Sequence, residues 1–277
     1  MAMDSQHNHC AVIGNPIAHS LSPEIHANFA QQFDMSLRYD KLLASDETFS
    51  QVVKDFFAGG GRGLNITTPF KEKAFQMCAS TFQLSRQARS CNTLYIDEGQ
   101  LVGTTTDGLG WLQDVERLGF KFADARILLI GAGGASRILL HSLLAQYEQL
   151  CFSDIVWSNR SIDKLAAQVD HERITKVGLS DIPASDYDLV INGLSVGWQN
   201  AYPELDIPLQ PDALIYDLNY GSGAQPFHDW ALAHGAGQDR LVDGWGMLVN
   251  QAAASFNIWW NKQPDTTALI ESGVIAH

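Results

Sequence analysis

A glycine-rich segment in the second half of the chain carries the clearest chemical signal. Gly131, Gly133 and Ser136 occupy the three small-residue positions of a G-x-G-x-x-G/A pattern, directly after the apolar run 126–130 and before an apolar helical pattern. Gly131 permits a tight turn, and Gly133 lets backbone amides approach a pyrophosphate at a helix N-terminus, whose partial positive charge favours phosphate. The segment predicts a dinucleotide site. A strand–helix turn that holds no ligand is the alternative.

The end of the next predicted strand indicates which dinucleotide binds. A site for NAD usually places a carboxylate there, whereas this chain has Asn159, Arg160 and Ser161, with Lys164 one helical turn later. A guanidinium matches the geometry of a 2′-phosphate, so the segment favours NADP. The alternative is a solvated pair of cations at the start of a surface helix.

Hydride transfer to a ketone also needs a proton donor for the forming alkoxide, and a lysine coupled to a carboxylate can serve. Lys71 lies just past a predicted strand–helix turn, and Asp107 lies near a predicted domain junction, where clefts form. Spacing alone does not distinguish an acid–base pair from two unrelated surface charges.

Hydrophobic periodicity and turn residues predict the helices and strands that position these residues. The first part of the chain predicts helices capped by Ser22 and Asp46, and strands at 10–13, 38–43, 63–66, 93–96 and 100–102, the last two as a hairpin. Beyond a boundary near Thr106, strands at 126–130, 155–158, 189–192 and 213–217 alternate with helices, which indicates a parallel sheet. A last helix is predicted over 245–260, and its pattern leaves open whether it packs on the first domain.

Composition limits the partners. The chain has 277 residues and a formal charge of −13, which disfavours nucleic acid and anionic lipid. No apolar run approaches the length of a membrane span, and the polar N-terminus lacks the apolar stretch of a signal peptide, so we expect a cytoplasmic protein. The four cysteines form no CxxC pair and are expected to be reduced. His7, His9 and Cys10 fit no common zinc spacing, so no metal is expected.

Several segments together resemble the shikimate dehydrogenases. They occur in the family's order and span nearly the whole chain: 14–23, 65–72, 91–94 with 106–108, 131–136, 159–161, 216–217 with 220, and 244–251. The resemblance implies reversible reduction of 3-dehydroshikimate to shikimate with NADPH, in the chorismate pathway to aromatic amino acids. It also implies a two-domain α/β fold, with a split substrate-binding domain (1–106, with 243–277 returning to it) and an inserted Rossmann-like NADP-binding domain (107–242). Whether the enzyme is a monomer or a homodimer stays open.

Carried over by position, the resemblance implies roles for individual residues. Lys71 and Asp107 would be the catalytic acid–base pair. The substrate-binding set would be Ser20, Ser22, Asn65, Thr67, Lys71, Asn92, Asp107, Tyr220 and Gln251. The cofactor-binding set would be Gly131, Ala132, Gly133, Gly134, Ala135, Ser136, Asn159, Arg160, Ser161, Lys164, Asn192, Leu218, Gly244 and Met247.

Some of these assignments have plainer alternatives. Ser20 and Ser22 would bind the substrate carboxylate, although helix capping also explains them. Asn65 would bond either the substrate or its own loop. Gln251 shares a helix face with Leu248 and Ser255, where a polar group needs a partner; a backbone carbonyl would satisfy it as well as a ring hydroxyl.

The chain departs from the family pattern at three positions. Thr105 replaces an asparagine, Leu194 replaces a threonine beside the expected nicotinamide site, and Lys164 replaces an arginine. The last change keeps the charge and loses the planar fork. Two other functions remain open: a quinate/shikimate dehydrogenase that uses NAD, against which Arg160 argues, and a non-catalytic NADPH-binding sensor, against which Lys71 and Asp107 argue.

Overall fold

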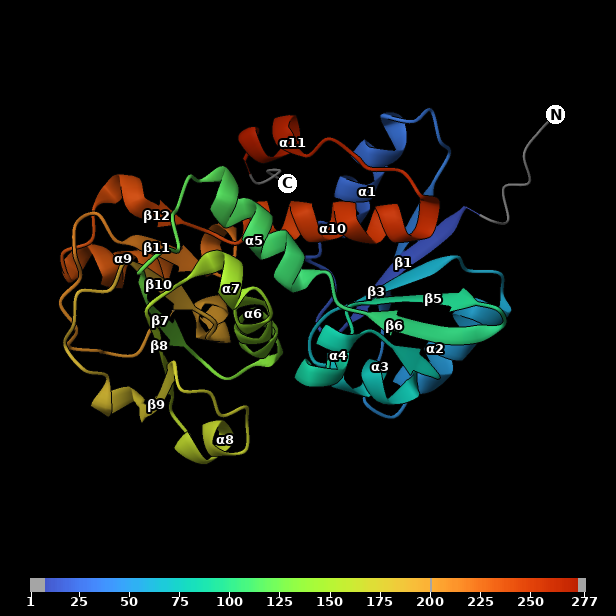
Figure 1. The fold of residues 1–277 in the computed structure, drawn as a ribbon. Helices are drawn as coiled ribbons and strands as arrows, with labels where there is room; N and C mark the ends of the chain where they lie inside the picture. Colours follow the sequence, from blue (N-terminus) through green and yellow to red (C-terminus); the bar gives the residue numbers. More distant parts are fainter. Residues whose placement is uncertain (1–7, 200, 274–277) are drawn as a thin grey trace. The chain divides into compact units, whose positions relative to one another are not determined.

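The computed structural model describes residues 8–199 and 201–273, so His7 lies outside the described residues. The chain divides into two compact units (Figure 1), one of Met1–Trp111 with Leu248–His277 and the other of Leu112–Met247. Within the described ranges, no helix is long and apolar enough to cross a membrane.

The first unit contains a mixed six-stranded sheet. Its strand order is β2-β1-β3-β5-β6-β4, in which β2, β1 and β3 are parallel and β5 and β6 form an antiparallel hairpin. The strands are β1 (His9–Gly14), β2 (Arg38–Leu43), β3 (Gly63–Ile66), β4 (Ser80–Thr81), β5 (Thr93–Asp97) and β6 (Gln100–Thr104). The helices are α1 (Ser22–Gln31), α2 (Phe49–Ala58), α3 (Lys71–Met77), α4 (Gln83–Ala88) and α11 (Thr267–Glu271). The predicted hairpin is confirmed.

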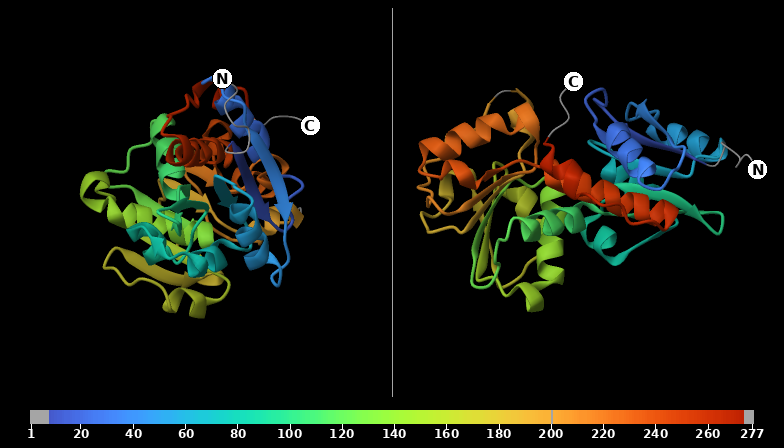
Figure 2. Two further views of the ribbon diagram at one scale, coloured as in Figure 1. Left: turned by 90° about the vertical axis from the view of Figure 1, so that its right-hand side faces the viewer. Right: turned by 90° about the horizontal axis from the view of Figure 1, so that it is seen from above.

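Helix α10 (Trp245–Trp260) lies along this sheet, as the two views of Figure 2 show. Its Ser255 accepts a hydrogen bond from Asn65 of β3 (3.0 Å), and the indole of Trp259 donates to the carbonyl of Leu94 in β5 (3.3 Å). A Cβ on Gly63 would collide with the Trp259 ring, so glycine is needed for this close packing. Helix α10 therefore packs on the sheet of the first unit, and the short helix α11, which was not predicted, follows it.

Two helix caps differ from the sequence expectation. Ser22 is the first residue of α1 rather than its N-cap, and its backbone amide donates to the hydroxyl of Ser20 (3.4 Å). Asp46 does not cap α2 either, because its carboxylate pairs with Lys73 (3.0 Å) and Thr48 takes the N-cap position. In each case the side chain of the expected cap residue has another polar partner, the hydroxyl of Ser20 for Ser22 and the ammonium of Lys73 for Asp46.

The second unit contains an all-parallel six-stranded sheet of order β12-β11-β10-β7-β8-β9. The strands are β7 (Arg126–Ile130), β8 (Asp154–Asn159), β9 (Ile174–Gly178), β10 (Leu189–Asn192), β11 (Leu214–Asp217) and β12 (Leu241–Val242). Numbered along the chain within this unit, the order is 3-2-1-4-5-6, the doubly wound arrangement of dinucleotide-binding domains. The central strands read as unbroken buried apolar runs, as expected where helices cover both faces.

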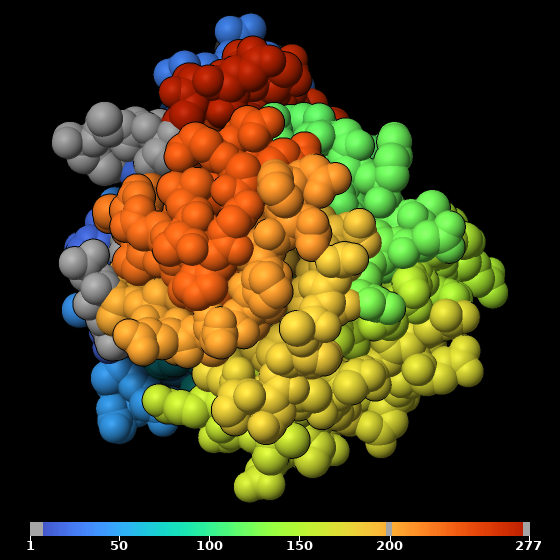
Figure 3. Space-filling view, turned by 90° about the vertical axis from the view of Figure 1, so that its left-hand side faces the viewer, coloured from blue at the N-terminus to red at the C-terminus, as the bar shows by residue number. Residues whose placement is uncertain are grey.

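The helices of this unit are α6 (Gly134–Ala145), α7 (Tyr147–Leu150), α8 (Ile162–Ala166) and α9 (Gln225–Ala233). Helix α5 (Asp107–Arg117) carries residues of both units. Short 3-10 turns lie at Leu179–Asp181, Ser195–Gln199, Gly221–Gly223 and Gln238–Arg240. The segments around β9 (yellow) and α9 (orange) make up much of the face seen in Figure 3.

Candidate active site

Lys71 and Asp107 form an ion pair in the first unit. The ammonium of Lys71 lies 2.7 Å from Oδ2 of Asp107, and their side chains are 20% and 6% exposed. Lys71 is the first residue of α3 and Asp107 the first residue of α5. The structure thus brings the two residues together, and excludes the alternative of two unrelated surface charges.

Asn92 fixes the other side of the Asp107 carboxylate. Its side-chain amide donates to Oδ1 of Asp107 (2.8 Å) and lies 3.1 Å from Oε1 of Gln251. Its own carbonyl oxygen accepts from the backbone amide of Thr106 (2.9 Å), which defines the orientation of the amide. One oxygen of Asp107 therefore faces Lys71 and the other faces Asn92.

Gln251 reaches this pair because α5 and α10 approach closely at Gly110. A Cβ on Gly110 would lie 2.5 Å from the backbone nitrogen of Gln251, so a larger residue would separate the helices. The Gln251 amide donates to the carbonyl of Leu248 (2.8 Å), one turn earlier. The side chain thus has the backbone partner anticipated for it, and its oxygen still faces Asn92.

Asn65 belongs to a buried polar cluster behind the ion pair. Its oxygen accepts from the hydroxyl of Tyr39 (2.7 Å), and its amide donates to Ser255 (3.0 Å) and to the carbonyl of Asn92 (3.2 Å). Burial raises the pKa of Tyr39 well above its ordinary value, so this hydroxyl remains a donor. The sequence left open whether Asn65 bonds the substrate or its own loop, and the structure shows it hydrogen-bonded to other residues of the protein.

The remaining residues predicted to bind substrate in this unit follow the carboxyl ends of β1 and β3. Ser20 and Ser22 lie beyond β1, and their hydroxyls are 3.2 Å apart. Thr67 lies directly after β3, and its amide donates to the carbonyl of Ile13 in β1 (3.0 Å). Ligands of α/β sheets bind outside the carboxyl ends of the strands, so this edge is where a substrate is expected.

The glycine turn of the second unit follows β7. Gly131 has φ of +104°, in the left-handed region that favours glycine, and a Cβ there would lie 2.9 Å from the Gly193 carbonyl oxygen. Its amide donates to the carbonyl of Ser158 (2.7 Å), and its carbonyl accepts from the Trp157 indole (2.8 Å). Because Gly131 follows β7 and Gly193 follows β10, the turn sits where the strand order reverses.

The other predicted phosphate contacts lie on the same edge of this sheet. Asn159 ends β8, next to β7, and its side-chain amide donates to the carbonyl of Ser161 (3.0 Å). Arg160, Ser161 and Lys164 are exposed. Two exposed cations, Arg160 and Lys164, therefore lie near the end of the strand next to the glycine turn, where they can meet an anion.

Hydrogen bonds join the carboxyl ends of β10 and β11. The Asn192 amide donates to Asp217 (2.9 Å), and the backbone amide of Leu218 donates to the carbonyl of Asn192 (2.9 Å). Burial raises the pKa of Asp217 to about 7, while hydrogen bonds from Asn219 and Asn192 act in the opposite direction. Gly244 approaches the end of β11 so closely that a Cβ would lie 2.5 Å from the Leu218 carbonyl oxygen. Leu218 and Gly244 are thus neighbours.

Met247 and Tyr220 complete the predicted site residues. Met247 is buried and Tyr220 is half-buried, both within residues of the second unit. Of the departures from the family pattern, the Thr105 hydroxyl is buried without a hydrogen-bond partner among the described residues. Leu194 packs against the apolar core of its unit, and its carbonyl accepts from Asn219 (2.9 Å).

Four residues of the polar cluster were not among the residues predicted from sequence: Tyr39, Thr93, Thr106 and Ser255. Ser255 lies four residues after Gln251, on the same helix face, so its position was a usable signal. The others lie on strands or strand ends that meet only through the order of the sheet.

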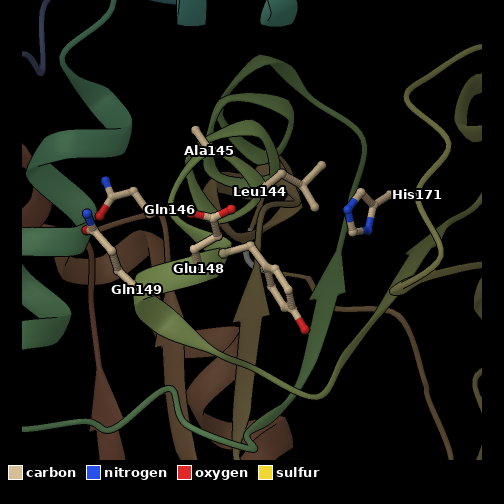
Figure 4. Close-up of a pocket in the computed structure, with 7 residues that line it drawn as sticks. Leu144, Ala145, Gln146, Glu148, Gln149 and His171 are labelled. Carbon is tan, nitrogen blue, oxygen red and sulfur yellow. The ribbon is translucent and has the colours of Figure 1, made fainter.

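A separate surface hollow of about 290 Å³ lies at the C-terminal end of α6 (Figure 4). Its lining residues are Leu144, Ala145, Gln146, Tyr147, Glu148, Gln149 and His171. None of them belongs to the predicted sites, and the glycine turn is at the opposite end of the same helix. Nor do the described residues bring three or more His, Cys, Asp or Glu side chains together as a metal site.

Comparison with known proteins gives consistent matches. Residues 12–94 match the model of the shikimate dehydrogenase substrate binding domain, and residues 244–272 match that of the shikimate 5′-dehydrogenase C-terminal domain. The NADP⁺ shikimate dehydrogenase of Halorhodospira halophila is 41% identical over 96% of this chain and 97% of its own length.

Two solved structures illustrate the likeness in fold. The Ael1 enzyme of Pseudomonas putida superposes with a TM-score of 0.86 at 37% identity, covering 97% of this chain and 99% of its own. The shikimate 5-dehydrogenase of Thermus thermophilus, in complex with NADP(H) and shikimate, superposes with a TM-score of 0.80 at 26% identity, covering 95% and 97%.

Proposed function

The chain belongs to the shikimate dehydrogenase family, and we propose from this that it catalyses the reversible, NADPH-dependent reduction of 3-dehydroshikimate to shikimate. The reaction would serve the pathway through chorismate to aromatic amino acids. The observation that carries the proposal is the 2.7 Å ion pair of Lys71 and Asp107, held by Asn92 beside Gln251. An ammonium positioned in this way is the proton donor that reduction of a ring ketone requires.

The geometry suggests a division of roles. Lys71 gives a proton to the ring oxygen as the carbonyl carbon accepts a hydride, and takes it back in the reverse direction. Asp107 holds the ammonium in place through Oδ2, and Asn92 prevents the carboxylate from turning. These contacts position the ammonium of Lys71. A displacement of about an ångström between reacting groups lowers the reaction rate strongly.

The substrate would be held by polar groups that its chemistry matches. Its ring hydroxyls suit Thr67, Asn92 and Gln251, and its carboxylate suits the hydroxyls of Ser20 and Ser22. By family resemblance, Tyr220 would also bind the substrate. Ser20 is half-buried and Ser22 is only 6% exposed, so hydrogen bonds to a carboxylate would form in a largely dry place.

The residues of the second unit fit a dinucleotide with a 2′-phosphate. The hydroxyl of Ser136, at the third small position of the turn, is buried without a hydrogen-bond partner among the described residues. A Cβ on Gly133 would meet only one atom, at 3.8 Å, so the turn is open there. Backbone amides from Gly131 to Ser136 would hold the pyrophosphate, and Arg160 with Lys164 the 2′-phosphate. NADPH, when bound, supplies the hydride.

The rest of the predicted cofactor set would surround the dinucleotide from the same edge of the sheet. Asn192 ends β10, Leu218 directly follows β11, and Gly244 and Met247 follow β12. The two domains proposed from the sequence would accordingly divide the work, with most substrate-binding residues in 1–106 and 243–277 and most NADP-binding residues in 107–242. We further propose that the enzyme works in the cytoplasm as a monomer or homodimer.

A paired assay tests the proposal. The purified protein is given shikimate or quinate with NADP⁺ or NAD⁺, and absorbance at the nicotinamide band is followed. We expect reduction of NADP⁺ with shikimate. Preferred use of NAD⁺ with quinate would support a quinate/shikimate dehydrogenase, and NADPH binding without turnover would support a sensor; either would contradict the proposal.

A further inference from the structure

Two cysteines meet beside a glycine in the unit that holds Lys71 and Asp107. Cys78 follows the last residue of α3, and Cys91 directly precedes Asn92. A Cβ placed on Gly103 of β6 would lie closer than 3.0 Å to both sulfur atoms. Because glycine has no side chain, the two thiols share the small space above it.

The two thiols differ in exposure and in pKa, as is needed for one to be oxidised before the other. Cys91 is fully buried, whereas Cys78 is partly exposed. Hydrogen bonding with Cys91 lowers the pKa of Cys78, against the effect of burial. The same pairing, together with burial, raises the pKa of Cys91. Since the thiolate is the reactive form, an oxidant would meet Cys78 first, with Cys91 placed to react next.

We propose that Cys78 and Cys91 are a modification site, which hydrogen peroxide oxidises to an intramolecular disulfide that slows turnover. The Cys78 sulfur attacks a peroxide oxygen, the O–O bond breaks, and the leaving hydroxide takes up the thiol proton as water. This leaves a sulfenic acid on Cys78. The Cys91 sulfur then attacks the Cys78 sulfur, the S–O bond breaks and a second water leaves. The two thiols together lose two electrons and two protons, and one peroxide is reduced to two waters.

The disulfide would act on the acid–base pair through the backbone. Helix α3 begins at Lys71 and ends just before Cys78, so both ends of one short helix are involved. The amide of Cys91 donates to the carbonyl of Lys71 (3.0 Å), and the next residue, Asn92, donates to Asp107 (2.8 Å). Drawing the sulfurs to a bond length of about 2.05 Å shifts one or both segments. The effect on turnover rests on the proposed function.

The other two cysteines serve as internal comparisons. Cys151 is exposed, and its thiol donates to the carbonyl of Glu148 (3.3 Å). Cys10 is buried, and burial raises its pKa to about 12, which keeps it protonated and unreactive. In a reducing compartment a disulfide is transient and typical of redox sensing. The proposed disulfide is therefore a reversible modification and does not serve to stabilise the fold.

The test treats the reduced protein with hydrogen peroxide and follows peptide mass and activity together. Trypsin separates the cysteines, since Cys78 falls in residues 74–86 and Cys91 in residues 90–117. We expect these two peptides to be joined in the non-reduced digest, kcat with shikimate and NADP⁺ to fall about tenfold, and dithiothreitol to reverse both changes. Cys78→Ser should keep its activity through the treatment, whereas Cys151→Ser should respond like the wild type.

Three results would overturn the proposal. One is the absence of the joined peptides while Cys78 is oxidised further. Another is full activity in a protein that carries the disulfide, and the third is equal inactivation of Cys78→Ser and the wild type. The peptide mass is independent of catalysis. A reduced protein without dehydrogenase activity would instead refute the proposed function, and with it the effect on turnover.

Discussion

Replacing Lys71 by alanine tests the assigned chemistry most sharply. The change removes the ammonium that lies 2.7 Å from Asp107 and leaves the carboxylate its bond from Asn92. A positioned general acid contributes about 10²- to 10⁴-fold in rate, which corresponds to about 2.7–5.4 kcal/mol in the barrier. We expect kcat to fall within that range and the KM for shikimate to change much less, because a proton-transfer group acts mainly in the transition state.

The matched control is Lys73→Ala, two residues later on the same helix. Lys73 pairs with Asp46, whose side chain is 80% exposed, and it belongs to neither predicted site. Its loss should change kcat by less than about twofold, since exposed ion pairs contribute little. Steady-state rates over a range of shikimate concentrations, with circular dichroism to verify folding, separate the two variants. A large rise in the KM of Lys71→Ala with unchanged kcat would refute the acid–base role.

Three further predictions follow from the structure. Arg160→Ala should raise the Kd for NADP⁺ by about 10- to 100-fold, because a charge-assisted hydrogen bond is lost, and leave NAD⁺ almost unaffected in fluorescence titrations; equal losses would contradict the 2′-phosphate assignment. Gly131→Ala should lower the free energy of unfolding by about 1–3 kcal/mol in urea, because φ is +104°, whereas Gly133→Ala should be near neutral; similar losses in both would refute this reason. Burial lowers the pKa of His26 to about 3. Below about pH 6.5 the unfolded chain therefore binds a proton on His26, whereas the folded chain does not. Lowering the pH from 7.5 to 5 should for this reason lower the free energy of unfolding by about 2 kcal/mol. The variant His26→Phe should lack that contribution in urea titrations at the two pH values, and an unchanged pH slope would count against it.

The second unit could be predicted closely from sequence because its signals are local. The apolar runs 126–130 and 189–192 are strands with those bounds, and the glycine turn begins a helix at Gly134, as the pattern indicates. Each signal depends on residues adjacent in the chain. Helix α9 was missed, and so was strand β9, which is only partly buried and carries no strong apolar run.

The first unit could be predicted less well, since its arrangement depends on distant contacts. The meeting of Lys71 and Asp107 follows from the order of the strands that precede their helices, and Gly110 lets α10 bring Gln251 close to the pair. No local pattern encodes that approach, so the pairing came from family resemblance. The cap at Ser22 was wrong because Ser22 is already the first residue of α1, and its own amide donates to the hydroxyl of Ser20.

Transfer of a labelled hydride is the most direct test of the central claim, that this chain reduces a ring ketone with a hydride from NADPH. The protein is supplied with 3-dehydroshikimate and NADPH that carries deuterium at the transferable position, and the product is examined by mass spectrometry and NMR. We predict shikimate with one deuterium on the carbon that was the carbonyl. NADPH binding with no labelled shikimate, or shikimate formed without the label, would contradict the account.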